Sequence, residues 1–188
     1  MALETPPYQL IKRQKPFELR RYAPYLSAQV SLTAANHRDA ANRGFGILAN
    51  YIFGNNATRQ KISMTSPVTA APAPQKIAMT APVMVSGSGR YQVEFSMPGK
   101  FTMETLPLPV DRRIEIVRNN PKTMAVVRFS GVFQQKNFDR QIQRLRSWIQ
   151  GHGWQELAPP VVAGYNPPFT PWFLKHNEIL IAVDGQEN

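Results

Sequence analysis

Residues 17–54 read FELRRYAPYLSAQVSLTAANHRDAANRGFGILANYIFG, and residues 114–151 read IEIVRNNPKTMAVVRFSGVFQQKNFDRQIQRLRSWIQG. At an offset of 97 positions the two stretches share residues in the same order. The shared residues include Glu18, Arg21, Pro24, Ala28, Val30 and Arg43, which fall on Glu115, Arg118, Pro121, Ala125, Val127 and Arg140. We therefore predict two copies of one strand–turn–strand–helix unit, each with a hairpin, and chance agreement is the alternative.

The helix of each copy is predicted from an apolar stripe at spacings of i, i+4, i+7 and i+11. The stripes are Ala41, Phe45, Leu48 and Ile52 in the first copy and Phe138, Ile142, Leu145 and Ile149 in the second. A glycine follows each stripe, Gly54 and Gly151, and ends the helix.

Between the two copies the chain repeats a short sequence, KISMTSPV at residues 61–68 and KIAMTAPV at residues 76–83. Apolar and polar residues alternate in both, so we predict two half-buried strands that end at Pro67 and Pro82. Two interpretations of Met64 and Met79 stay open. They are either adaptable core fillers or the walls of a pocket for a flat apolar ligand.

Further strands are predicted at residues 8–12, 91–97, 161–165 and 178–183. The expected fold is α+β: a distorted antiparallel, β-barrel-like sheet with two main helices and a pseudo-twofold repeat of strand–strand–helix–strand units. We expect a single domain over residues 1–188, with pseudo-repeats at about 8–98 and 111–184. A groove is expected where the two halves meet.

The composition limits the chemistry and the partners. The 188 residues include no cysteine, which excludes disulfides and cysteine-based metal sites. A formal net charge of +10 attracts anions without choosing among nucleic acid, membrane surfaces and carboxylate-bearing ligands. Neither a signal-peptide pattern nor a long apolar run is found, so a cytoplasmic protein is expected.

Several ordered blocks carry a resemblance to a known family. They are FELRRYAP (17–24), YIFGNN (51–56), YQVEFSMP (91–98), ETLPLP (104–109), RFSG (128–131) and YNPPFTPWFLKHNE (165–178). With these blocks the chain resembles the SOUL haem-binding family over residues 8–184. The resemblance implies a distorted barrel that binds haem or a related tetrapyrrole, without enzymatic activity, in an apolar groove beside the first helix.

The resemblance also implies roles for individual residues. The apolar walls of the groove would be Phe45, Ala49, Met64, Met79, Phe169 and Trp172, and the carboxylates of the ligand would meet Arg43 and Lys175. Some members carry a histidine where this chain has Arg21, and others carry basic residues where it has Asn42 and Asn50.

Three histidines are available as axial ligands of haem iron, and His176 is the best candidate because His37 and His152 flank the helices and are expected to be solvated. Met64, Met79 and Tyr51 are alternatives. A groove that holds the ligand by apolar contact alone, without an axial bond, is equally consistent with the sequence.

Two rival functions stay open. Glu178 is either the groove carboxylate of a sensor or scavenger of cationic amphiphiles or a strand-end residue held by backbone amides or an arginine. A scaffold is the other rival, since a basic stripe of Lys136, Arg140 and Arg144 on the second helix suits an acidic partner. No nucleic-acid motif accompanies this stripe, and no catalytic motif is found, so we expect neither nucleic-acid binding nor enzymatic activity. We also expect the protein to be a monomer.

Overall fold

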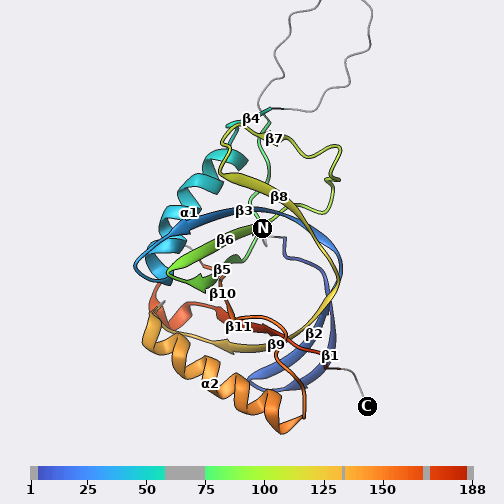
Figure 1. Cartoon of the computed structure of the whole chain (residues 1–188), viewed down its shortest axis with the longest axis vertical. Coiled ribbons are helices and arrows are strands. Elements are labelled where there is room, and N and C mark those ends of the chain that lie inside the picture. Colours follow the sequence, from blue (N-terminus) through green and yellow to red (C-terminus); the bar gives the residue numbers. More distant parts are fainter. Residues whose placement is uncertain (1–3, 58–74, 133, 167–169, 186–188) are drawn as a thin grey trace, which may run out of the picture.

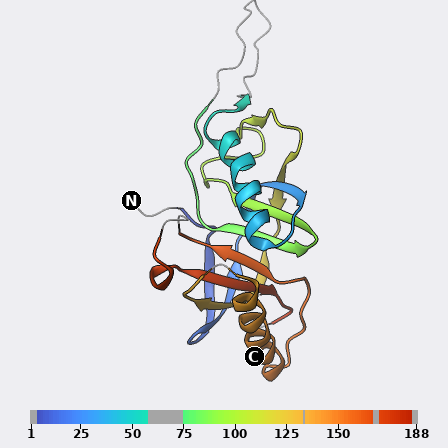
Figure 2. The ribbon, with the colours of Figure 1, turned by 90° about the vertical axis from the view of Figure 1, so that its left-hand side faces the viewer.

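The computed structural model describes residues 4–57, 75–132, 134–166 and 170–185. A nine-stranded antiparallel sheet curls into a half-barrel, and two helices lie against its outer side, as Figure 1 and Figure 2 show. The predicted α+β fold with a distorted barrel-like sheet is confirmed. Neither described helix is long and apolar enough to cross a membrane.

The elements follow the chain in this order: β1 (Tyr8–Gln14), β2 (Phe17–Tyr22), β3 (Tyr25–Thr33), α1 (His37–Ile52), β4 (Asn56–Ala57), β5 (Val83–Ser88), β6 (Arg90–Ser96), β7 (Leu108–Pro109), β8 (Ile114–Asn119), β9 (Lys122–Phe129), α2 (Gln135–Gly151), β10 (Val161–Gly164), the 3-10 turn η1 (Trp172–Leu174) and β11 (Asn177–Ala182). The large sheet has the order β1-β2-β9-β11-β10-β5-β6-β3-β8, and β4 pairs only with β7.

The sheet order is symmetric about the pair of β5 and β10. If β2 is exchanged with β8, β3 with β9, β5 with β10 and β6 with β11, the order from β2 to β8 becomes the same order read from the other end. Strand β1 lies outside this symmetric part. The register follows the same rule: Phe17 pairs with Val127, and at an offset of 97 positions Ile114 pairs with Val30. The sequence repeat and the strand pairing therefore follow the same pseudo-twofold relation. The predicted single domain over residues 1–188 and the limits of its repeats, at about 8–98 and 111–184, stay predictions.

The predicted hairpins are wrong. β2 pairs with β1 and β9, and β3 pairs with β6 and β8, so the two strands of each unit lie in different parts of the sheet. A residue before proline favours extended backbone, and Ala23 and Asn120 stand before Pro24 and Pro121. The chain therefore runs on from β2 to β3, and from β8 to β9, instead of folding back.

The repeated eight-residue sequence is only partly described. Residues 61–68, with Met64, lie outside the described residues. The predicted strand at residues 76–83 is wrong, because β5 begins only at Val83, after Pro82, which has no N–H to donate to a ladder. Before it, Thr80 forms a single bridge with Glu4. Met79 is partly buried and packs against the core under α1.

Side chains alternate between the two faces of the sheet. The outer face forms two apolar cores, one under α1 on β3, β5 and β6 and one under α2 on β9 and β11. Central members of the first core are Val30, Val85 and Val93. The inner, concave face carries the polar side chains described below.

Helix α1 packs unusually close to β6 because of Gly44. A Cβ atom at this position would lie 2.5 Å from Cγ2 of Val93, much closer than two carbon atoms approach. The buried face of α1 is therefore centred on Ala40, Gly44 and Leu48. The predicted apolar stripe through Ala41 and Phe45 is rotated about the helix axis relative to this buried face, so Phe45 lies at the boundary with solvent.

We expect Gly44→Ala to lower the free energy of unfolding by about 1–3 kcal/mol, because the added methyl group overpacks against Val93. Gly46 is the control: a Cβ there meets nothing within 4 Å, so Gly46→Ala raises stability by about 0.5–1 kcal/mol through helix propensity. Urea denaturation measures both. If the contact with Val93 is the cause, Gly44→Ala costs less when Val93 is already replaced by Ala, and an equal cost in both backgrounds contradicts this explanation.

Candidate functional site

The concave face of the sheet encloses a cavity of about 480 Å³, a size typical of small-molecule sites. Its walls come from both halves of the chain. Its polar and charged lining includes Arg20, Tyr22, Tyr25, Gln29, Gln92, Glu94, Asn119, Lys122, Arg128, Tyr165, His176 and Glu178, and its apolar lining includes Met84, Met124, Val161 and Leu180.

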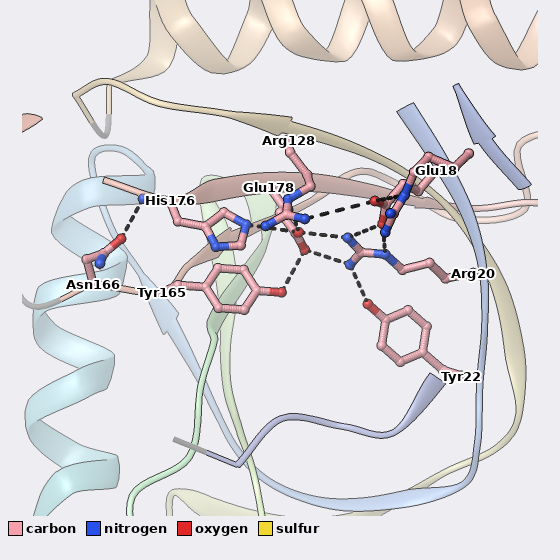
Figure 3. Close-up of polar contacts among 9 residues, drawn as sticks. Glu18, Arg20, Tyr22, Arg128, Tyr165, Asn166, His176 and Glu178 are labelled. Carbon is pink, nitrogen blue, oxygen red and sulfur yellow. Dashed lines mark hydrogen bonds and ion pairs between the residues drawn. The ribbon is translucent and has the colours of Figure 1, made fainter. Parts of the chain in front are cut away.

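A buried ion pair between Arg20 and Glu178 dominates one wall of this cavity. Arg20 on β2 donates from Nη1 to Oε2 of Glu178 over 2.9 Å and from Nη2 to Oε1 over 2.8 Å. Both side chains are almost completely buried, although 158 positions separate them in the sequence. Figure 3 shows the guanidinium of Arg20 facing the carboxylate across the strands. A planar, two-point pair of this kind is a strong and directional contact.

Further polar groups saturate Glu178 (Figure 3). Tyr165 donates its hydroxyl hydrogen over 2.6 Å, and Nε2 of His176 lies 3.0 Å from Oε1. The rings of Tyr165 and His176 are stacked, with centroids 4.2 Å apart. Nε of Arg128 adds a second guanidinium group, 3.5 Å from Oε1.

Arg20 is saturated in the same way, because Glu18 accepts from its Nε over 2.7 Å and Tyr22 accepts from Nη1 over 3.2 Å. The two central charges therefore bind each other and their neighbours, and neither is left for a ligand.

The surroundings shift the pKa values of these groups. Burial alone would raise the pKa of Glu178, but the hydrogen bonds from His176 and Arg20 and the charge of Arg20 outweigh it and lower this pKa to about 2. Burial acts to lower the pKa of Arg20, and Glu178 more than compensates and raises it. Burial raises the pKa of Tyr22 to about 12. The ion pair is therefore charged throughout the physiological pH range.

The opposite wall is built around Glu94 on β6. Tyr25 donates its hydroxyl hydrogen to Oε1 over 2.9 Å, and Nε2 of Gln29 donates to Oε2 over 3.0 Å. Burial raises the pKa of Glu94, and the hydrogen bonds and the charge of Lys122 offset this only in part. Unlike Glu178, this carboxylate has no arginine within ion-pair distance among the described residues.

The residues predicted as a site fall on two faces of the molecule. Among the predicted residues whose side chains the structure describes, His176 and Glu178 are those that line the concave cavity. Phe45, Ala49 and Met79 lie on the side of α1, where the ring of Phe45 contacts Phe95 at 5.4 Å between centroids. Arg43 also lies on α1 and donates to the carbonyl oxygen of Thr33 over 2.8 Å.

The remaining predicted residues lie near or outside the described region. Met64 and Phe169 fall outside it. Trp172 begins η1, and Lys175 is a partly buried residue between η1 and β11. The cavity residues Arg20, Glu94 and Tyr165 were missed by sequence reasoning. For Arg20 the sequence offers one signal, the alternation of Glu18 and Arg20 with the apolar residues Phe17 and Leu19 on β2. The same alternation is typical of a strand whose polar face is exposed to solvent, so it does not identify a buried site.

The candidate iron ligands lie in different surroundings. Nε2 of His176 contacts Glu178 on the concave face. His37 is the first residue of α1, and its Nδ1 contacts Gln135, whereas His152 packs between Trp148 and Trp154. The hydroxyl of Tyr51 is buried and donates to the carbonyl oxygen of Pro107. His176 and Tyr51 therefore direct their polar atoms at other groups of the protein.

The outer surface of α1 is uncharged over its second half. Between Gly44 and Phe53 the chain carries no charged residue, and the side chains of Phe45 and Phe53 are 36% and 57% exposed. Surface helices usually turn charged residues outwards, as α2 does with Arg144 and Arg146 in the equivalent part of the helix. Exposed apolar residues continue from the end of α1 to β7, where the exposed Leu108 pairs with Ala57.

Comparison with known proteins shows the family to which the sequence is similar. Residues 3–182 match the family described as SOUL heme-binding protein. The chain is 26% identical to human Heme-binding protein 2 over 195 residues, covering 94% of this chain and 88% of that protein. It is 25% identical to Heme-binding protein 1 of Xenopus laevis over 170 residues, covering 86% and 84%.

Two solved structures share the fold at low sequence identity. The EcmrR C-terminal domain matches with a TM-score of 0.63 and 11% identity, over 95% of this chain and 99% of that one. A structure described as a hydrolase from Listeria innocua matches with a TM-score of 0.58 and 9% identity, over 93% and 94%. At these identities the likeness concerns the fold alone.

We expect Glu178→Gln to lower the free energy of unfolding at pH 7 by about 3–5 kcal/mol, because it leaves Arg20 buried without its counter-charge. A carboxylate with a lowered pKa stabilises the fold above its ordinary pKa, and this contribution is lost as the pH falls through the lowered value. The difference between wild type and variant therefore narrows between pH 4.5 and about 2. Denaturant titrations across this range measure it.

The control for this substitution is Glu115→Gln, which makes the same chemical change at an exposed position and is expected to alter stability by less than about 0.5 kcal/mol. A Glu178→Gln protein as stable as this control at pH 7 would contradict the role given to the ion pair.

Proposed function

This chain belongs to the SOUL heme-binding protein family, and on that basis we propose that it binds haem or a related tetrapyrrole, without chemical turnover, in an apolar groove beside α1. The proposal concerns the ligand and its place on the molecule. Relatives named as heme-binding proteins support the choice of ligand.

The observation that carries the location is the uncharged second half of the outer surface of α1, from Gly44 onwards. The second helix occupies the equivalent place in the other half of the molecule and keeps its charged residues, so the fold itself does not require an apolar surface there. Exposed Phe45 and Phe53 cost solubility in a free protein and gain free energy when a flat apolar ligand covers them.

Two basic residues are proposed for the carboxylates of the ligand. Arg43 directly precedes the uncharged part of α1, and its exposed guanidinium contacts only the carbonyl of Thr33 and, at 3.5 Å, Asp39 among the contacts described. Lys175 follows η1 and is partly exposed. Both contacts of Arg43 are surface contacts, which a bound carboxylate displaces at low cost.

The rival based on Glu178 has less support. A carboxylate that binds cationic ligands needs a free face, whereas Glu178 already accepts from Arg20, Tyr165 and His176. A cationic ligand there would have to displace a buried arginine, which leaves that arginine unpaired.

We expect haemin to give saturable, one-to-one binding with a change in its Soret band, and Phe53→Glu to weaken this binding at least tenfold. The added carboxylate places a charge on the surface that the porphyrin would cover. The control is Gln150→Glu, which adds the same negative charge at the equivalent, exposed position of α2 and leaves the affinity unchanged. Absence of saturable binding, or equal losses in the two variants, would sink the proposal.

We expect His176→Ala to leave the Soret maximum of the haemin complex in place. Its Nε2 faces Glu178 on the concave side of the sheet, away from α1, so it is not positioned to bind iron in the proposed groove. Absorption and electron paramagnetic resonance spectra of the complex test this, with circular dichroism to verify folding. A change of spin state or of the Soret maximum in the folded variant would assign His176 as the iron ligand instead.

A further inference from the structure

The concave cavity and the surface of α1 are separated by one layer of sheet. On β6, Val93 points into the core under α1, while Gln92 and Glu94 line the cavity. The same alternation on β3 places Val30 under the helix and Gln29 in the cavity. A ligand in the cavity therefore occupies a different site from one that lies against α1.

Glu94 is the cavity carboxylate with acceptor capacity left. Each oxygen of a carboxylate accepts about two hydrogen bonds. Oε1 of Glu94 receives one, from Tyr25, Oε2 receives one, from Gln29, and Ser27 adds a further hydrogen bond to the carboxylate. The remaining acceptor direction, together with the one that Ser27 uses, can take two parallel N–H donors, as in arginine–carboxylate contacts.

The rest of the lining favours a flat ligand. Four tyrosines line the cavity, and the rings of Tyr8 and Tyr22 lie 5.3 Å apart. Apolar side chains complete the walls, with Met84 directly across from Glu94 on the neighbouring strand. Aromatic and thioether groups of this kind pack well against planar rings.

Charged groups of both signs line the cavity. The positive groups are Arg20, Lys122 and Arg128, and the carboxyl groups are Glu94 and Glu178. Because Arg20 and Arg128 already contact Glu178, an ionic ligand would have to compete with these contacts and would also lose its hydration. An uncharged ligand enters without this penalty.

We propose that the concave cavity is a second small-molecule site, which takes an uncharged, planar heteroaromatic compound whose edge carries two adjacent N–H donors, bound by Glu94. A 2-aminopyrimidinone edge has this pattern. The site is independent of the groove beside α1 and of the ligand proposed there.

Isothermal titration calorimetry with pterin, an uncharged bicyclic compound that carries this edge, tests the proposal near neutral pH. We expect saturable binding to the wild-type protein and at least tenfold weaker binding of 1,3-dimethyllumazine, which has a similar ring system without the N–H donors. Ethidium, a planar cation, is expected to bind more weakly than pterin.

Two variants locate the site. Glu94→Gln replaces one of the two acceptor oxygens by an amide donor, and Met84→Phe fills the cavity beside it without changing charge, so both are expected to weaken pterin binding at least tenfold. Glu115→Gln is the matched control, because it lies across β3 from Glu94, on the other side of Gln29, outside the cavity lining, and is expected to bind as wild type does. Circular dichroism verifies folding, and Met84→Phe decides if Glu94→Gln does not fold.

Three results would overturn the proposal. The first is the absence of saturable pterin binding, or binding that a folded Glu94→Gln or Met84→Phe protein keeps in full. The second is tighter binding of ethidium than of pterin with the same dependence on Glu94, which would make the site a cation site. The third is competition between haemin and pterin in the wild-type protein, which would show that the two ligands share one site.

Discussion

The architecture depends on the exchange of first strands between the two halves of the chain. β2 leaves its own half and pairs with β9, and β8 pairs with β3 in return. This exchange joins the halves into one continuous sheet and brings Arg20 from the start of the chain to Glu178 near its end. Without the exchange Arg20 and Glu178 would not lie on neighbouring parts of one sheet and could not form their ion pair. The sheet would also present two more unpaired edges.

The sequence reveals the symmetry of this fold but not its pairing. The offset of 97 positions between Glu18 and Glu115, or Val30 and Val127, predicts two equivalent units and matches the register of the strands. The partner of β2 is invisible in the sequence, because hydrogen bonds between distant strands leave no local pattern. The short connection between β2 and β3 favours a hairpin, but these two strands do not pair in the structure.

The candidate sites are likewise only partly predictable from the sequence. Glu178 is recognisable as a carboxylate that needs a partner when buried, and an arginine was one of the expected partners. The identity of that arginine, and the environment of Glu94, depend on which strands are neighbours. The uncharged stretch of α1 can be read directly from the sequence, whereas its contrast with α2 acquires meaning only once both helices are known to occupy equivalent places.

The exchanged strands also bear on how the chain is made. During synthesis β2 emerges early and has only β1 as a neighbour until β9 follows, about a hundred residues later. The outer edge of that hairpin stays open while the ribosome adds the first helix and most of the sheet. The strands β5, β6, β3 and β8 can pair before β9 is made, but the two halves of the sheet join only afterwards. A nascent chain arrested before β9 therefore carries an exposed template for wrong intermolecular pairing.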